Sequence, residues 1–286
     1  MDLRARFLRP LKRVAIRAVY RNTTEYPLRI DGKSVVFSTV GPTANFFFTS
    51  SLAFGRVPER PVTSLILDDL RQARCFVDVG ANLGYYSCLA RAFMPKGEIH
   101  AFEMDRDNHA LLELNLSLNP SEVEAVANQV AVTDEPGEVT YDHLAGASSP
   151  VLSIYQHPDE ILNAYGLTGD EPVTTVTVPA VTLDGYFADR SLRPDVVKID
   201  VEGAEYDVLR GMAGLLAEID RMYVEIHPRM LATAGHEVAD VLKLLLGEHF
   251  RLFAIPGHRT QVKQASLEEL NESSQLTTNT MVLATR

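Results

Sequence analysis

The chain has 286 residues, of which 46% are hydrophobic and 23% are charged. These values are typical of a globular protein that folds as one large α/β domain with an extension, or as two smaller domains. No apolar run has the length of a membrane span, and two cysteines are too few for a disulfide framework. Both cysteines are expected to be buried thiols in a reducing compartment, which predicts a cytoplasmic protein.

The net charge of −11 is unevenly distributed along the chain. Residues 1–21 contain seven Arg or Lys and one acid, a net charge of +6, so residues 22–286 carry −17. A body this acidic repels nucleic acid, and we expect no nucleic-acid partner. The N-terminal segment predicts a basic amphipathic helix, which either packs on the protein or makes peripheral contact with an anionic membrane. Its apolar face is formed by Phe7, Leu8, Leu11, Val14, Ala15, Ala18 and Val19.

Residues 22–74 predict an accessory hairpin followed by a helix. The stretch from Tyr26 to Ser51 is rich in β-forming residues, and Asp31-Gly32 has the composition of a hairpin turn. A helix is expected from Thr63 to Arg74. Its apolar face is formed by Leu65, Ile66 and Leu70.

The stretch CFVDVGANLGYYSCLA, residues 75–90, predicts a buried strand, a glycine turn and a helix. Glycine lets the backbone approach a ligand closely, and this order of elements builds nucleotide pockets in open α/β sheets. The turn reads Asp78-x-Gly80-x-Asn82-x-Gly84, which lacks the middle glycine of the dinucleotide motif. An acid on the strand repels a pyrophosphate but suits the ammonium or sulfonium of S-adenosylmethionine. The simpler interpretation is a buried strand that ends in an ordinary turn.

Strands and helices then alternate, as expected for a doubly wound sheet. Strands are expected over 97–104, 123–132, 195–200 and 221–227, helices over 106–119 and 236–250, and a closing strand pair over 250–255 and 279–286. Residues 173–187 predict β structure that leads into a short helix. No hydrophobic period is sustained between His143 and Glu171, so this segment is expected to be a loop or lid.

Five residues close predicted strands at the edge where ligands bind in parallel sheets. They are Asp78, Glu103, Gln129, Asp200 and His227. Glu103 lies about 20 residues beyond the glycines, the separation at which an acid accepts both hydroxyls of an adenosine ribose. Asn128, Gln129 and Ala131 are placed to read adenine, although they could equally be ordinary strand-end residues.

Five motifs, in this order, resemble the FkbM-type family of S-adenosylmethionine-dependent methyltransferases. They are FVDVGANLGYYS, AFEMDRDNHALLELNLSLN, VTLDGYF, VVKIDVEGAEYDVLRGM and YVEIH, within residues 75–227. The resemblance implies an α/β class I methyltransferase (Rossmann-like) domain over 75–286, with a seven-stranded sheet whose last strand is antiparallel. It also implies O-methylation of a hydroxyl on a small molecule or sugar, including a glycan or glycolipid. Met104 stands where the family commonly has proline, and 142–172 matches nothing diagnostic, which leaves the acceptor open.

Methyl transfer to oxygen requires an aligned acceptor and removal of its proton. Asp200 and His227 end neighbouring strands beside the expected cofactor site, and the unperturbed pKa of His227, about 6.5, suits a general base. Asp200 either orients the hydroxyl or joins Glu225 or His227 in holding a divalent cation such as Mg²⁺ or Mn²⁺. His227 could instead cap a backbone group.

Lys198 lies within a predicted strand, where burial without a partner is expensive. We expect Glu202 or Glu205 to pair with it, and both acids to be mainly structural at the start of a helix.

A nicotinamide-dependent oxidoreductase and a non-catalytic methyltransferase fold, used for binding or as a scaffold, remain alternatives. An amino-group methyltransferase typically ends its fourth strand in Asn/Asp-Pro-Pro-aromatic. The strand predicted over 195–200 instead ends in Asp200-Val201-Glu202-Gly203, which argues against that class.

Overall fold

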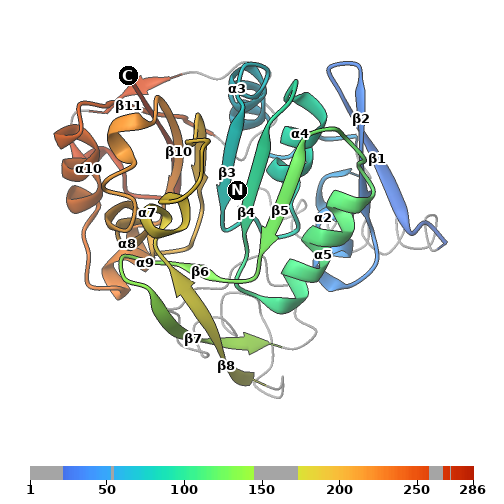
Figure 1. Ribbon diagram of the computed structural model, residues 1–286, viewed down its shortest axis with the longest axis horizontal. Helices are drawn as coiled ribbons and strands as arrows, with labels where there is room; N and C mark the ends of the chain where they lie inside the picture. The colour runs from blue at the N-terminus through green and yellow to red at the C-terminus, as the bar shows by residue number, and fades with distance from the viewer. Residues whose placement is uncertain (1–21, 53–54, 145–172, 258–266, 271) are drawn as a thin grey trace, which may run out of the picture.

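The main body of the protein is an eight-stranded sheet with helices on both faces (Figure 1). The computed structural model describes residues 22–52, 55–144, 173–257, 267–270 and 272–286. The helix predicted over 1–21 and most of the loop or lid predicted between His143 and Glu171 lie outside these residues.

The order of strands in the main sheet is β12–β11–β13–β10–β9–β3–β4–β5. The bounds are β3 (Cys75–Val79), β4 (Glu98–Phe102), β5 (Glu124–Asn128), β9 (Val196–Ile199), β10 (Arg221–Ile226), β11 (Arg251–Ala254), β12 (Glu268–Glu269) and β13 (Thr280–Thr285). From β5 to β10 neighbouring strands are parallel, whereas β13 is antiparallel to both β10 and β11. The expected antiparallel last strand is therefore present. The sheet has one strand more than expected, because the two-residue β12 pairs with the outer edge of β11.

Alternation of side chains along the central strands divides the apolar residues between two cores. On β10, Tyr223 belongs to one core, whereas Met222 and Val224 belong to the other. The first core is covered by α2 (Pro42–Ser50), α3 (Arg60–Leu70), α4 (Tyr85–Phe93) and α5 (Arg106–Ser117). The second is covered by α7 (Leu183–Phe187), α8 (Glu205–Arg210), α9 (Pro228–Thr233) and α10 (Val238–Gly247). Short 3₁₀ turns occur at Leu216–Glu218 and Ser273–Gln275.

The predicted hairpin consists of β1 (Glu25–Ile30) and β2 (Lys33–Ser38), which pair in antiparallel register. Its turn places both Asp31 and Gly32 at positive φ, 43° and 79°, as the Asp-Gly pair predicts. Asn115 of α5 and Asn119, just beyond its C-terminal end, hold the hairpin on the first core. Their side-chain oxygens accept hydrogen bonds from backbone N–H groups of β2 at 2.8 Å. The β character expected up to Ser51 is wrong beyond β2, since Pro42 opens the helix α2 in the first turn, where its missing N–H is tolerated.

A second, three-stranded sheet has the order β6–β8–β7 and lies at the end of the main sheet where β5 stops (Figure 1). Its strands are β6 (Ala131–Val132), β7 (Gly137–Leu144) and β8 (Val173–Val181). The single strand predicted over 123–132 is thus two strands in two sheets. β5 ends where its partner β4 ends, at the pair Asn128–Phe102, whereas Ala131 pairs with Ala180 of β8.

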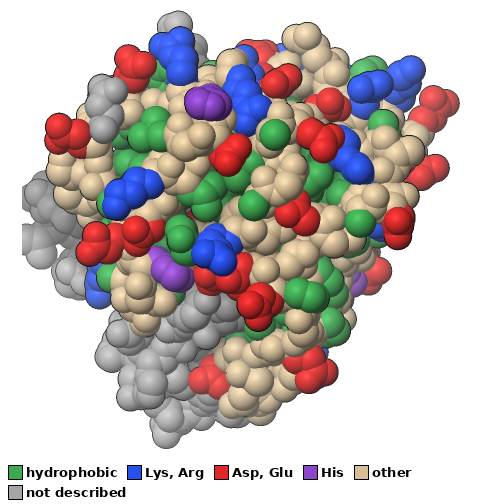
Figure 2. Space-filling view, turned by 60° about the vertical axis from the view of Figure 1, so that its left-hand side comes forward, with side chains coloured by type: hydrophobic (Ala, Val, Ile, Leu, Met, Phe, Trp, Pro, Cys, Tyr) green, Lys and Arg blue, Asp and Glu red, His purple; other side chains and the backbone are tan. Residues whose placement is uncertain are grey.

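Among the residues that the structure describes, no helix is both long enough and apolar enough to cross a bilayer. On the face shown in Figure 2, Lys and Arg side chains are separated by acidic and apolar ones rather than gathered into one basic stripe. This surface is consistent with the acidic balance of the chain. The expectation that nucleic acid is not a partner stays a prediction.

Candidate active site

A cavity opens at the carboxyl ends of β3, β4 and β9, the edge of the sheet to which the strand-end residues point. It is lined by Val79, Gly80, Asn82, Phe102, Glu103, Met104, Asn108, Val130, Ala131, Val132, Asp200, Val201, Glu202 and Ala204. Five of the residues predicted from the sequence are in this lining. They are Gly80, Asn82, Glu103, Ala131 and Asp200.

The glycine turn presents bare backbone to the cavity at Gly80, where the chain is packed against the neighbouring strand end. Gly80 has φ 74°, and a Cβ at this position would lie 1.9 Å from the carbonyl oxygen of Asp200. The N–H groups of Gly80 and Ala81 both donate to the carbonyl oxygen of Phe102, at 3.0 and 2.9 Å. Asn82 also has positive φ, 52°. Only glycine fits at position 80, so the turn is held tightly between β4 and β9.

Glu103 borders the cavity and is tied to the same turn. Its carboxylate accepts the backbone N–H of Asn82 at 2.7 Å and that of Asp105 at 2.9 Å. Burial raises the pKa of Glu103 to about 7, although these two hydrogen bonds act in the opposite direction. Each carboxylate oxygen accepts one backbone hydrogen bond and retains a lone pair, so Glu103 can accept hydroxyl donors from the cavity.

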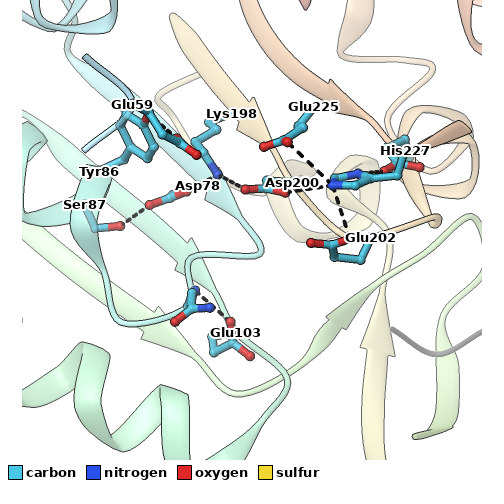
Figure 3. A network of polar contacts seen from close by, with 12 residues as sticks. Glu59, Asp78, Tyr86, Ser87, Glu103, Lys198, Asp200, Glu202, Glu225 and His227 are labelled. Carbon is cyan, nitrogen blue, oxygen red and sulfur yellow. Dashed lines mark hydrogen bonds and ion pairs between the residues drawn. The ribbon is translucent and has the colours of Figure 1, made fainter. Parts of the chain in front are cut away.

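Two of the predicted cofactor residues stand behind the cavity wall rather than in the lining. Asp78 is buried, accepts a hydrogen bond from the Ser87 hydroxyl at 2.7 Å and lies 3.9 Å from the Lys198 ammonium (Figure 3). Burial raises the pKa of Asp78, and Lys198 partly offsets this effect. Gly84 has φ 84° and is the N-cap residue that precedes α4, with the Leu112 side chain against it. In the structure both residues support the glycine turn.

Of the three residues predicted to read adenine, one lines the cavity and two do not. Ala131 lines the cavity, whereas the amide of Asn128 is used within the fold, donating to the carbonyl of Ala101 and accepting from the hydroxyl of Tyr186. Gln129 is exposed to solvent and is not part of the lining. Apolar side chains that the sequence analysis missed complete this wall: Phe102, Met104, Val130 and Val132. The apolar alternation of Val130 and Val132 is the signal that could have indicated the last two of these.

Lys198 is buried beside a group of carboxylates at the centre of the site (Figure 3). Its ammonium lies 3.2 Å from Asp200 Oδ2 and 3.9 Å from Asp78 Oδ1. Burial alone would lower the pKa of Lys198, but the nearby carboxylates, led by Asp200 and Asp78, outweigh burial and raise it. The partners expected from the sequence, Glu202 or Glu205, were wrong. Its partners are Asp200, two residues further along just past the end of its own strand, and Asp78 on the neighbouring strand β3, rather than the acids further along the turn.

His227 and Asp200 lie together, as their positions on adjacent strands predict. His227 is fully buried, and its Nδ1 lies 2.6 Å from Glu205 Oε1. Its Nε2 faces three further carboxylates, those of Glu202 at 3.2 Å, Glu225 at 3.7 Å and Asp200 at 3.8 Å (Figure 3).

This environment changes what His227 can do. Burial lowers the pKa of His227, but the hydrogen bond to Glu205 and the charges of Glu202 and Asp200 outweigh burial and raise it to about 10. The ring therefore carries two protons at neutral pH in the absence of another cation. A protonated imidazole does not accept a proton, so His227 in this state cannot act as the predicted general base.

Glu202 is the site residue whose role the sequence analysis underestimated. It lines the cavity next to Asp200 and has an unusual backbone conformation for a non-glycine residue, φ 49°. The signal for it was present in the sequence as two acids separated by one residue, immediately before Gly203.

The parallel sheet with its antiparallel β13, and the cavity between a glycine turn and an acidic strand end, define a class I methyltransferase fold. The family model for the methyltransferase FkbM domain matches residues 78–252. The chain therefore belongs to the FkbM methyltransferase family, and it is an S-adenosylmethionine-dependent methyltransferase.

The chain is similar to several proteins of known description. The hexuronic acid methyltransferase AglP of Haloferax volcanii is 28% identical over 190 residues, 65% of this chain and 67% of the relative. The 31-O-demethyl-FK506 methyltransferase FkbM of Streptomyces tacrolimicus is 28% identical over 211 residues, 65% of this chain and 76% of the relative. The crystal structure of a methyltransferase FkbM from Methylobacillus flagellatus aligns with a TM-score of 0.43 at 14% identity. That alignment covers 85% of this chain and about half, 52%, of that protein.

Proposed function

We propose that this enzyme transfers the methyl group of S-adenosylmethionine to the oxygen of a hydroxyl on a sugar or another small molecule. The observation that carries the proposal is that two carboxylates, Asp200 and Glu202, share one cavity with the glycine turn and Glu103. A carboxylate beside the cofactor position accepts the hydrogen bond of an acceptor hydroxyl, orients its oxygen and takes up its proton as the methyl group is transferred.

The residues on the other side of the cavity fit S-adenosylmethionine. Gly80 presents bare backbone, Glu103 presents a carboxylate able to accept ribose hydroxyls, and Met104 and Val130 contribute to an apolar surface suited to a purine ring. When bound, the cofactor supplies a methyl group already activated on a sulfonium. The protein therefore has to bind and orient the acceptor, accept its hydroxyl proton and exclude water.

Asp200 is the residue that we assign to orienting the acceptor. One of its oxygens is held by Lys198 at 3.2 Å, and its side chain is partly exposed in the cavity, 25%, whereas His227 is fully buried and absent from the lining. His227 therefore acts through Asp200 and Glu202 rather than by touching the acceptor.

The names of the two relatives support an oxygen acceptor on a sugar or a natural product, since one is described for hexuronic acid and the other for a 31-O-demethyl substrate. Glycans and glycolipids belong to the same class of acceptor. This chain matches both relatives over 65% of its length.

The test is methyl transfer from labelled S-adenosylmethionine to an extract of small molecules and glycans, followed by mass spectrometry for products heavier by one methylene. Asp200→Asn should lower turnover by about 10²–10⁴-fold while cofactor binding, measured by calorimetry, stays the same. Glu122→Gln makes the same kind of change at an exposed position and should transfer at the wild-type rate. Cofactor binding without transfer to any hydroxyl, or methylated products bearing the label on nitrogen, would contradict the proposal.

A further inference from the structure

We propose that Asp200, Glu202 and His227 form a binding site for a divalent cation at the edge of the cavity. Its use in methyl transfer rests on the proposed function, but the binding of the ion does not. The three residues come from the ends of β9 and β10 and the turn that follows β9, segments that the strand order makes neighbours.

The ligand atoms have the spacing that a small cation requires. One ligand atom from each residue lies within 4.8 Å of the others, and His227 Nε2 is 3.2 Å from Glu202 Oε2 and 3.8 Å from Asp200 Oδ1. For metal–ligand bonds of about 2.1 Å, adjacent ligands of an octahedral ion lie about 3 Å apart and opposite ligands about 4 Å apart. The cluster therefore needs only small side-chain movements to bind an ion.

His227 supplies an independent indication, because one of its nitrogens is buried among these carboxylates and makes no hydrogen bond. Nε2 has no hydrogen-bond partner although the residue is completely buried. The opposite nitrogen, Nδ1, is fixed by Glu205 Oε1 at 2.6 Å, which also accepts the backbone N–H of Gly203 at 3.0 Å. A histidine that ligates a metal almost always donates its other N–H to such a carboxylate.

Asp200 is oriented in a corresponding way. Its Oδ2 accepts a hydrogen bond from the Lys198 ammonium at 3.2 Å, while Oδ1 is the oxygen on the side of His227. Lys198 and Glu205 thus stand in the second layer around the cluster, each fixing one proposed ligand. Such outer partners are a regular feature of metal sites.

The position of the cluster leaves coordination places open toward the acceptor. Asp200 and Glu202 line the cavity, and His227 lies behind them. An ion held here would face the cavity and could bind an acceptor hydroxyl, lowering its pKa and fixing its oxygen. Two carboxylates and one imidazole suit Mn²⁺, which accepts oxygen ligands as Mg²⁺ does and also tolerates nitrogen.

The full chain is purified in the presence of a chelator, freed of the chelator and titrated with Mn²⁺ alone. The electron paramagnetic resonance signal of free Mn²⁺ reports how much of the ion is bound. We expect one ion to bind per chain, with a dissociation constant in the micromolar range. Glu202→Gln should weaken binding by at least about tenfold, and Glu205→Gln, which changes only the outer partner of His227, by about 10–100-fold. Glu122→Gln is the matched control and should bind as the wild type does.

Equal Mn²⁺ affinity in Glu202→Gln and Glu122→Gln, or no binding by the wild-type chain, would overturn the proposal. Thermal unfolding with and without Mn²⁺ keeps the test valid if a variant is unstable, since an ion bound only by the folded chain raises the wild-type midpoint. Cofactor binding and methyl transfer, measured in chelator and with Mn²⁺, distinguish a failure of the cation site from a failure of the proposed function. A chain that binds S-adenosylmethionine and methylates a hydroxyl without Mn²⁺ binding refutes the cation alone. Mn²⁺ binding without transfer to any hydroxyl refutes the proposed function alone.

Discussion

Glu103 connects the protonation of one side chain to the proposed binding of the cofactor. It is a buried carboxyl at the cavity wall with a pKa raised to about 7. Ribose hydroxyls donate more strongly to the ionised form than to the neutral one. With that pKa, about nine-tenths of Glu103 is ionised at pH 8 and about one-tenth at pH 6.

We therefore predict that the affinity for S-adenosylmethionine falls by up to about tenfold when the pH is lowered from 8 to 6. The sign follows from the raised pKa, since protonation removes the stronger acceptor as the pH passes down through about 7. Calorimetric titration at several pH values measures the effect. In Glu103→Gln, affinity should be lower at pH 8, and the component of the pH dependence due to this residue should disappear. A variant with the wild-type pH profile would remove Glu103 from the ribose assignment.

At the scale of single residues, the sequence predicted positions better than it predicted contacts. Asp200 and His227 could be brought together because adjacent parallel strands end at the same edge. The contact of Glu202 with His227 could not be predicted, since it depends on a left-handed backbone at Glu202, φ 49°, which directs the side chain back to the sheet. Lys198 was assigned wrong partners because its contacts depend on side-chain direction. It meets Asp200, just past the end of its own strand, and Asp78 on the neighbouring strand β3.

Among the elements, α5 and the three-stranded sheet are joined by the carboxylate of Asp105. Asp105 caps the N-terminus of α5, with Oδ1 accepting the N–H groups of Asp107 and Asn108 at 3.0 Å. Its Oδ2 accepts the hydroxyl of Tyr141 at 3.1 Å and lies 2.7 Å from Nδ1 of His143, both on β7. Asp105 itself is buried.

Asp105→Ala should therefore lower the free energy of unfolding by about 2–4 kcal/mol, because it removes a helix cap and leaves buried donors without their charged acceptor. Thr182→Ala is the matched control. Thr182 caps α7 through a single hydrogen bond to the N–H of Gly185 at 3.1 Å, so its loss should cost only about 1 kcal/mol. Urea unfolding of both variants measures the difference. Equal losses would show that the link to β7 contributes nothing.

Most elements were predictable from hydrophobic periodicity, and the errors occur where tertiary pairing decides. Residues 123–132 were predicted as one strand because apolar residues lie on both sides of Asn128-Gln129, whereas β5 and β6 pair with different partners, β4 and β8. The aromatic run after Pro42 has high β propensity but forms α2, which packs Phe48 into the first core. The two-residue β12 is too short to leave a periodic signal.

For the molecule as a whole, the distribution of charge predicts how it meets a membrane. Residues 1–21 carry +6 and the remaining residues −17, so the N-terminal segment has the net positive charge that an anionic surface attracts. The predicted amphipathic helix lies outside the residues that the structure describes, and its role remains a prediction.

We predict that the full chain co-sediments with vesicles containing phosphatidylserine at low salt and that a chain lacking residues 1–21 does not. Each Lys or Arg near such a surface contributes about 1 kcal/mol, and salt should weaken the binding. Neutral phosphatidylcholine vesicles are the control, and both proteins should bind S-adenosylmethionine equally. If the shortened chain fails to fold, the segment is a packed structural helix and the membrane interpretation is wrong.

The position of β13 has a consequence for how the protein is made. Thr280–Thr285 lie between β10 and β11, pairing with both, although both are synthesised earlier. A ribosome must therefore release the chain at least to Thr285 before the gap in the sheet can close. Until then the facing edges of β10 and β11 expose unpaired backbone groups of the kind that recruit other chains. Folding of this domain is thus expected to be completed only after these residues leave the exit tunnel, during an interval in which chaperone binding would protect the nascent chain.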